Sequence, residues 1–526
     1  MAESQTYSRL NSQWKSTCRL LLGKEVGELS DYSDWLLEGI EPTQLCTSEV
    51  SGKEVHVVGR YAKNSSFISS DEINYGEKSP PLSLNELKDV DSIIEALSER
   101  VIYAGNIVLG NSSHIEQSTG IENGHFVLGS HTIHNSQDIA YCSLCREDKT
   151  VFGSVLAGES DFVIKARNAW RSTRCLENSL VLESSDIYYS HDMEGCSQCM
   201  FCFGLKAKRH CIGNLPLSSA KYAQIKAGLI EEIAEELQKR KRLRWFPEFA
   251  PQEQSRAFPS LIAPSEDKPD MGAINGSFEK ITDIVLGKPL RETESLEGYF
   301  SKNIRSVESV PSAVSGRTAY YDELAFSKAL AESGRMVKYF ELTGIAGLAF
   351  EARKISLNDL RLSDIPDFIE PIAYFTSEHR HHSKNVIECP STFESHDCFR
   401  CSRAYSSENS CYSFWPRDSE YLLGCDSTRT SSFCINCYNS FKLSRCFETD
   451  TSQSCTGAYF CHNCENVHDS MFCFNKKNLR YAIGNVEVGR EVFQKVKNLL
   501  MSQITDELEK KKDFKWNIYN IGAGRK

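Results

Sequence analysis

Two Cys-x-x-Cys pairs, Cys434/Cys437 and Cys461/Cys464, lie in the stretch "FCINCYNSFKLSRCFETDTSQSCTGAYFCHNC". Closely spaced thiolates are the usual ligands of structural zinc and of iron–sulfur clusters. A second cluster of sulfur and imidazole ligands lies in the first half of the chain: Cys196, Cys199, Cys202, Cys211 and His191. Binding of Zn or Fe–S by these clustered side chains is therefore one hypothesis for the chemistry of the protein.

The chain is a tandem duplication, and this bears directly on the cysteines. The segment "MFCFGLKAKRHCIGN" begins at Met200, and a similar segment, "MFCFNKKNLRYAIGN", begins at Met471. The same offset in numbering places His191 on His462 and Trp245 on Trp516. Self-similarity of this kind predicts a repeated structural unit. We expect five parts: an N-terminal α/β segment at 1–104, a repeat region with its helix at 105–245, a Pro-rich linker at 246–276, the second N-terminal segment at 277–375, and the second repeat region with its helix at 376–526.

A shorter period of about 18 residues runs through each copy. One column at this step is small and includes Cys401, Cys437, Cys455 and Cys473. Another column is large and includes Phe441, Tyr459, Phe152, Trp170 and Tyr188. A common size within a column is typical of stacked coils, because each inward side chain packs on the one above it. The pattern predicts a mainly β, α+β protein with two tandem β-solenoid (β-helix) units of about 18 residues per coil, spanning 105–214 and 376–485.

A helix is expected after each solenoid. Apolar residues at helical spacing form one stripe: Tyr222, Ile225, Leu229, Ile233 and Leu237. The second copy repeats the stripe: Phe493, Val496, Leu500, Ile504 and Leu508. Such stripes are typical of amphipathic helices. Because the end of a solenoid exposes unpaired strand edges, we expect each helix to cap the last coil.

Comparison of the two copies favours packing over metal binding for the cysteines. The counterparts of the four Cys-x-x-Cys residues are Val163, Ala166, Ser190 and Met193. Exchange with small or apolar residues is the behaviour of a buried cysteine in a core. We therefore predict a structural role for the cysteine columns and no cofactor, with Zn or Fe–S binding as the alternative.

The bulk composition excludes some classes of function. The formal net charge is −11 over 526 residues, which argues against a dedicated nucleic-acid binder. The sequence shows neither a membrane-spanning apolar run nor the apolar stretch of a signal peptide, so we predict a cytoplasmic protein. Polar residues that recur in both copies are candidates for surface contacts: Arg174, Arg445, His191, His462, Lys239 and Lys510.

The segments "FCHNCENVHDSMFCFNKKNLRYAIGN" and "MFCFGLKAKRHCIGN", each followed by a helix, and "RWFPEF" in the first copy resemble a Cys-rich repeat family of candidate-phyla bacteria. Members of that family are often catalogued under a CoA-transferase-like name that their motifs do not support. The resemblance covers the repeat region and helix of each copy, and it implies the repeat fold rather than an activity. This chain departs from the family in being duplicated and in lacking its N-terminal Cys-x-x-Cys zinc ribbon.

Taken together, these features predict a non-enzymatic structural or scaffold protein that uses a duplicated β-solenoid surface for protein–protein interaction or self-assembly. The first alternative is a metal or Fe–S protein. The second is a carbohydrate-active β-helix enzyme, although no acidic cluster recurs at the 18-residue step.

Overall fold

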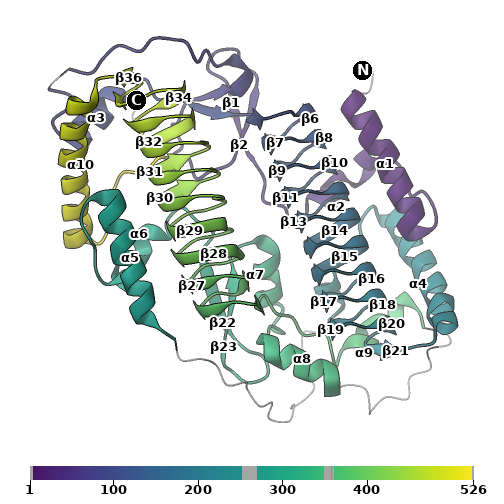
Figure 1. The fold of residues 1–526 in the computed structure, drawn as a ribbon. Helices are drawn as coiled ribbons and strands as arrows, with labels where there is room; N and C mark the ends of the chain where they lie inside the picture. The colour runs from purple at the N-terminus through teal and green to yellow at the C-terminus, as the bar shows by residue number, and fades with distance from the viewer. Residues whose placement is uncertain (1–3, 84, 251–268, 349–356, 358–359, 524–526) are drawn as a thin grey trace.

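The chain folds around two large parallel sheets of many short strands, and a helix follows each sheet (Figure 1). The computed structural model describes residues 4–83, 85–250, 269–348, 357 and 360–523. The first sheet runs from β5 (Val108–Leu109) to β21 (Leu215–Pro216), and the second runs from β24 (His379–His381) to β36 (Val486–Glu487). The prediction of a mainly β chain with two stacked-strand regions, each followed by a helix, is confirmed at this level.

The expected 18-residue step is wrong, because the strands pair at a 12-residue step. In the first sheet β14 (Asp161–Trp170) pairs with β15 (Thr173–Leu182), and Asp161 lies opposite Thr173. In the second sheet β31 (Ser444–Asp450) pairs with β32 (Thr456–Glu465), and Asp450 lies opposite His462. Apart from the first pair, β5 with β7 (Thr119–Glu122), the parallel pairs of both sheets keep this 12-residue register.

The 18-residue columns arose because small residues recur at every sixth position. Successive strands begin six positions apart: β6 at Ser113, β7 at Thr119, β8 at His125 and β9 at His131. Alternate strands pair with each other, β6 with β8 and β7 with β9. An 18-residue step therefore moves from one row of strands to the other row. Cys437 and Cys473 lie on the same row as Cys401, whereas Cys455 lies on the other. All four are buried, as are Phe152, Tyr188 and Tyr459.

A ladder of side-chain hydrogen bonds follows the 12-residue step. The amide of Ser130 donates to Ser118 Oγ at 3.0 Å, and the amide of Cys142 donates to Ser130 Oγ at 2.9 Å. The next amide, of Ser154, donates to Cys142 Sγ at 3.3 Å. The Cys142 thiol in turn donates to the carbonyl of Ala140 at 3.2 Å. At these positions the Ser hydroxyl and the Cys sulfur both accept a hydrogen bond from a buried amide that the strand pairing leaves without a partner.

Both expected helices are present and bury the predicted stripes. They are α4 (Ser219–Arg240) and α10 (Arg490–Lys511). The side chain of Ser218 accepts a hydrogen bond from the Lys221 amide and caps α4 at its N-terminus. In Figure 1 each helix stands alongside its stack of strands, next to α1 (Gln5–Leu22) in the first copy and α5 (Met271–Leu286) in the second.

The last strands of each sheet pack against the other copy. The segment with β1 (Gln44–Thr47), β2 (Glu54–Val57), β3 (Phe67–Ser69), α3 (Val90–Leu97) and β4 (Tyr103–Gly105) shares a hydrophobic core with the second sheet. The segment with β22 (Val307–Pro311), β23 (Thr318–Asp322), α7 (Ala325–Glu332), α8 (Tyr339–Leu348) and α9 (Ile365–Ile369) shares a core with the first sheet. Two turn glycines mark these contacts, since Gly213 faces Phe368 and Gly484 faces Leu97. The two copies therefore exchange these parts of their N-terminal segments, whereas α1 and α5 pack on the sheets of their own copies.

The structure describes only the two ends of the expected linker at 246–276. Its first residues form a short 3₁₀ helix, Phe246–Phe249, and α5 already begins at Met271. Residues 251–268 lie outside the described residues.

Ser190 tests the ladder directly. Its hydroxyl oxygen accepts from the Cys202 amide at 3.0 Å, and its hydroxyl donates to the Tyr188 carbonyl at 2.9 Å. We expect Ser190→Ala to lower the free energy of unfolding by about 1–3 kcal/mol, because a buried amide loses its partner. Ser190→Cys keeps a sulfur acceptor and should lose less. Urea denaturation of the three proteins measures the difference, and equal losses for the Ala and Cys variants would contradict the ladder.

Candidate functional site

A cluster of buried polar side chains lies where β4 of the first copy meets the second sheet. At its centre are Asp450 of β31 and His462 of β32, which stack in register and are fully buried. The His462 Nδ1 atom lies 2.9 Å from Asp450 Oδ2. An aspartate that orients a histidine in this way is the arrangement of many acid–base sites.

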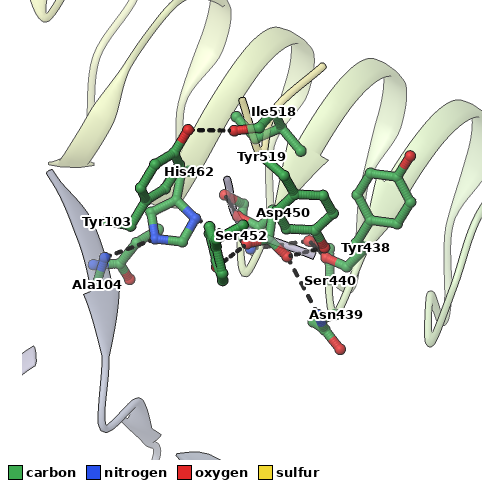
Figure 2. Close-up of polar contacts among 12 residues, drawn as sticks. Tyr103, Ala104, Tyr438, Asn439, Ser440, Asp450, Ser452, His462, Ile518 and Tyr519 are labelled. Carbon is green, nitrogen blue, oxygen red and sulfur yellow. Dashed lines mark hydrogen bonds and ion pairs between the residues drawn. The ribbon is translucent and has the colours of Figure 1, made fainter. Parts of the chain in front are cut away.

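Three further donors converge on the same carboxylate, and Figure 2 labels two of them, Tyr519 and Asn439. The hydroxyl of Tyr61 donates to Asp450 Oδ2 at 2.9 Å, and the hydroxyl of Tyr519 donates to Oδ1 at 3.2 Å. The Asn439 amide lies 3.3 Å from Oδ1. Burial raises the pKa of Tyr61 and of Tyr519 well above the usual range, so both hydroxyls stay protonated and donate. The buried carboxylate is therefore fully hydrogen-bonded.

The second nitrogen of His462 is occupied by the backbone of the other copy. Its Nε2 accepts a hydrogen bond from the amide of Ala104 in β4 at 2.9 Å (Figure 2). The ring is consequently neutral, with its proton on Nδ1 and directed at Asp450. A general base needs a nitrogen within reach of a substrate, and this ring presents none. The Asp450–His462 pair anchors the exchanged segment instead.

The first copy has the matching anchor with a different partner. His191 Nε2 accepts from the amide of Thr376 at 2.9 Å, and Thr376 belongs to the second copy. The counterpart of Asp450 in the first copy is Ser179. Among the described residues, Ser179 Oγ and His191 Nδ1 have no hydrogen-bond partner. Burial lowers the pKa of His191 from 6.5 to about 3, so this ring is also neutral.

The six predicted surface contacts divide into two groups. Lys239, Lys510 and Arg445 are exposed, and Arg174 forms an ion pair with Asp186 at 2.8 Å. His191 and His462 are fully buried, so the prediction that these two histidines lie on a binding surface is wrong. Their recurrence in both copies reflects the two anchors.

The predicted metal ligands lie in the stacked strands and contact the strands of neighbouring coils. Cys199 lies opposite Cys211 in the parallel register. The sulfur of Cys196 accepts from the Lys208 amide, and that of Cys202 accepts from the Asn214 amide. Within the described part of the chain, no group of three or more His, Cys, Asp or Glu side chains is arranged to hold a metal ion.

The buried thiols shift in both directions, because hydrogen bonding to Cys199 lowers the pKa of Cys196 to about 7 and also lowers the pKa of Cys211. Burial raises the pKa of Cys175 and of Cys455 to about 12, and a neutral thiol is a weak ligand and a weak nucleophile. The recurring glutamates are also internal. Glu177 pairs with Arg167 at 2.9 Å, and Glu448 accepts from the Ile518 amide at 2.8 Å.

Some members of these anchors could not be found from the sequence. Ala104 and Thr376 contribute backbone amides, which carry no residue-type signal. Asp450 does precede His462 by one 12-residue step, so the correct register would have brought these two together.

No helix among the described residues is long and apolar enough to cross a membrane. No protein-family model, curated protein or solved structure significantly matches the chain. The resemblance to the Cys-rich repeat family therefore stays a prediction.

The buried neutral His191 predicts an acid-sensitive fold. Its pKa is about 3 in the folded chain against 6.5 when exposed, so below pH 6.5 the unfolded chain binds the extra proton and stability falls. For this histidine we expect a loss of roughly 2 kcal/mol between pH 7 and pH 5. His191→Gln retains an acceptor for the Thr376 amide and does not titrate, so urea melts of the variant should show a shallower loss over this range. Identical pH slopes would contradict the assignment.

Proposed function

We propose that the chain is a non-enzymatic scaffold: two tandem β-solenoids with a 12-residue coil, held in one orientation and used for protein–protein assembly. Two strands of each coil, offset by six positions, pair with the strands of the next coil. Solenoids of this kind offer long, regular outer faces, which are frequent binding surfaces.

The observation that carries the proposal is the reciprocal pair of histidine anchors. His462 holds Ala104 of the first copy, and His191 holds Thr376 of the second. Each contact is buried and crosses between copies, so the two solenoids behave as the halves of a permanent dimer. A fixed arrangement of outer faces is what a scaffold requires.

The internal use of reactive groups supports a structural role over the two alternatives. The carbohydrate alternative needs acidic residues that face a sugar, whereas Glu177, Glu448 and Asp450 are buried and hydrogen-bonded within the chain. The metal alternative needs a converging set of ligands, whereas the described part of the chain holds no group of three or more His, Cys, Asp or Glu side chains so arranged.

An apolar patch on the outer face of α10 is the best-supported assembly surface. Val492 and Leu499 are 41% and 47% exposed, and they lie two helical turns apart on one face of the helix. The counterparts in α4 are Lys221 and Gly228, so the patch belongs to the second copy alone. One patch per chain fits a closed two-fold pair of chains.

Light scattering at several concentrations tests assembly through this patch. We expect the wild-type mass to rise above the 59.4 kDa of one chain, and the double variant Val492→Glu/Leu499→Glu to stay monomeric, because two charges cannot be buried in an apolar contact. Val50→Glu is the matched control, since Val50 is 66% exposed but lies outside α10. A wild-type chain that is monomeric at every concentration would overturn assembly.

Elemental analysis with an absorbance spectrum separates the scaffold from the metal alternative. We expect protein purified under reducing conditions to be colourless and to contain no stoichiometric zinc or iron, because the Cys196 and Cys202 sulfurs accept backbone amides and no set of three ligands converges among the described residues. One metal equivalent that is lost in Cys199→Ser but kept in Cys18→Ser would contradict this expectation.

A further inference from the structure

A small cavity lies between the two stacks of strands, with walls from both copies. Its volume is about 50 Å³, and its polar and aromatic lining includes Arg146, Glu159, Asn168, Trp170, Trp415 and Arg417. The Glu159 carboxylate forms an ion pair with Arg171 at 2.9 Å and accepts from the Trp170 indole at 3.3 Å. Arg146 ends β11 (Ser143–Arg146), and Arg417 begins β29 (Arg417–Leu423), in the two facing stacks of Figure 1. The two arginines occupy the same position in the two copies.

Arg417 is a buried cation that lacks a counter-ion. Its relative exposure is 3%, and no described carboxylate forms an ion pair with it. The buried Nε and Nη2 atoms have no hydrogen-bond partner among the described residues. The guanidinium stacks on Trp415 at 3.9 Å from the ring centroid, which leaves the in-plane N–H groups unused. A buried charge without a partner is costly, and native proteins rarely retain one without a reason.

Two more donors border the same cavity. Asn168 is 2% exposed, and its amide nitrogen also lacks a partner within the described chain. The side chain of Arg146 is 39% exposed and bonds Glu147 at 2.9 Å, so the cavity has a route to solvent along this residue. Burial, and secondly the neighbouring Arg146, lower the pKa of Arg417 to about 9.

Another cavity between the stacks contains an arginine that does have a carboxylate partner. There Arg429 forms an ion pair with Glu122 and stacks on Phe441, the counterpart of Trp170. Glu122 also lies 3.2 Å from His134 Nδ1. The counterpart of Glu122 is Phe393, so the second copy provides no carboxylate at the equivalent position.

We infer that the cavity around Arg417 binds a small oxyanion, phosphate or the phosphoryl group of a phosphomonoester, between the two copies. The Arg417 Nε and Nη2 atoms form the planar fork that binds two oxygens of such a group. Asn168 supplies a third donor from the other copy. The ligand thereby links the two copies through charge-assisted hydrogen bonds. This site is independent of the assembly patch on α10.

Titration calorimetry and thermal unfolding of the full chain test the site, with inorganic phosphate and phenyl phosphate as probes and NaCl at matched ionic strength. We expect saturable stabilisation by at least one phosphate probe and none by NaCl. Tighter binding of phenyl phosphate would assign the site to a phosphomonoester whose ring contacts Trp170 or Trp415, and tighter binding of inorganic phosphate would assign it to the free ion.

Arg417→Met should weaken phosphate binding by about 10-fold or more, because charge-assisted hydrogen bonds are lost. Without phosphate this variant should be at least as stable as wild type, since an unpaired buried charge is removed. Arg445→Met, which removes an exposed arginine of β31, is the matched control and should bind as wild type does. Asn168→Ala provides a second variant should Arg417→Met fail to fold, with weaker phosphate binding expected. Absence of saturable stabilisation of the wild type, or equal phosphate responses of the Met variants, would overturn the site.

Discussion

The 12-residue register is the constraint on which the rest of the structure depends. It places every inward side chain directly beneath its counterpart in the next coil, so the interior must be filled by residues that stack on their own kind. Ser and Cys suit this interior because each is small and satisfies an amide of the next strand, as Ser130 does for Cys142 and Cys142 does for Ser154. The abundance of cysteine in the sequence thus follows from packing and hydrogen bonding.

Stacking alone does not complete either sheet, because the last strands of each stack need cover. The chain provides this cover by exchange, because the region from β1 to β4 of the first copy and the region from β22 to α9 of the second each complete the core of the other copy. A buried histidine then holds a backbone amide across each junction. Neither copy has its full core without the other, which explains why the two are retained in a single chain.

The sequence predicted the duplication, the stacked strands and both helices, since each rests on a local periodic signal. The register was wrong because small residues recur at every sixth position, so steps of 6, 12 and 18 all map small residues onto small ones. Only strand pairing, such as that of Asp161 with Thr173, distinguishes these steps. The exchange of segments could not be predicted, because Ala104 and Thr376 contribute backbone amides whose histidine partners lie far away in the sequence.

The positions at which the two copies differ carry the specific chemistry. A duplicated chain begins with two identical interfaces, and each later difference changes one side alone. Asp450 gives the His462 anchor a hydrogen-bonded carboxylate, whereas its counterpart Ser179 leaves Nδ1 of His191 without a partner among the described residues. Glu122, whose counterpart is Phe393, neutralises Arg429 in one cavity, whereas the Nε and Nη2 atoms of Arg417 in another have no partner among the described residues. The histidine anchors, which recur in both copies, hold the two halves together. The positions that differ between the copies leave a single Arg417 cavity where exact symmetry would give two.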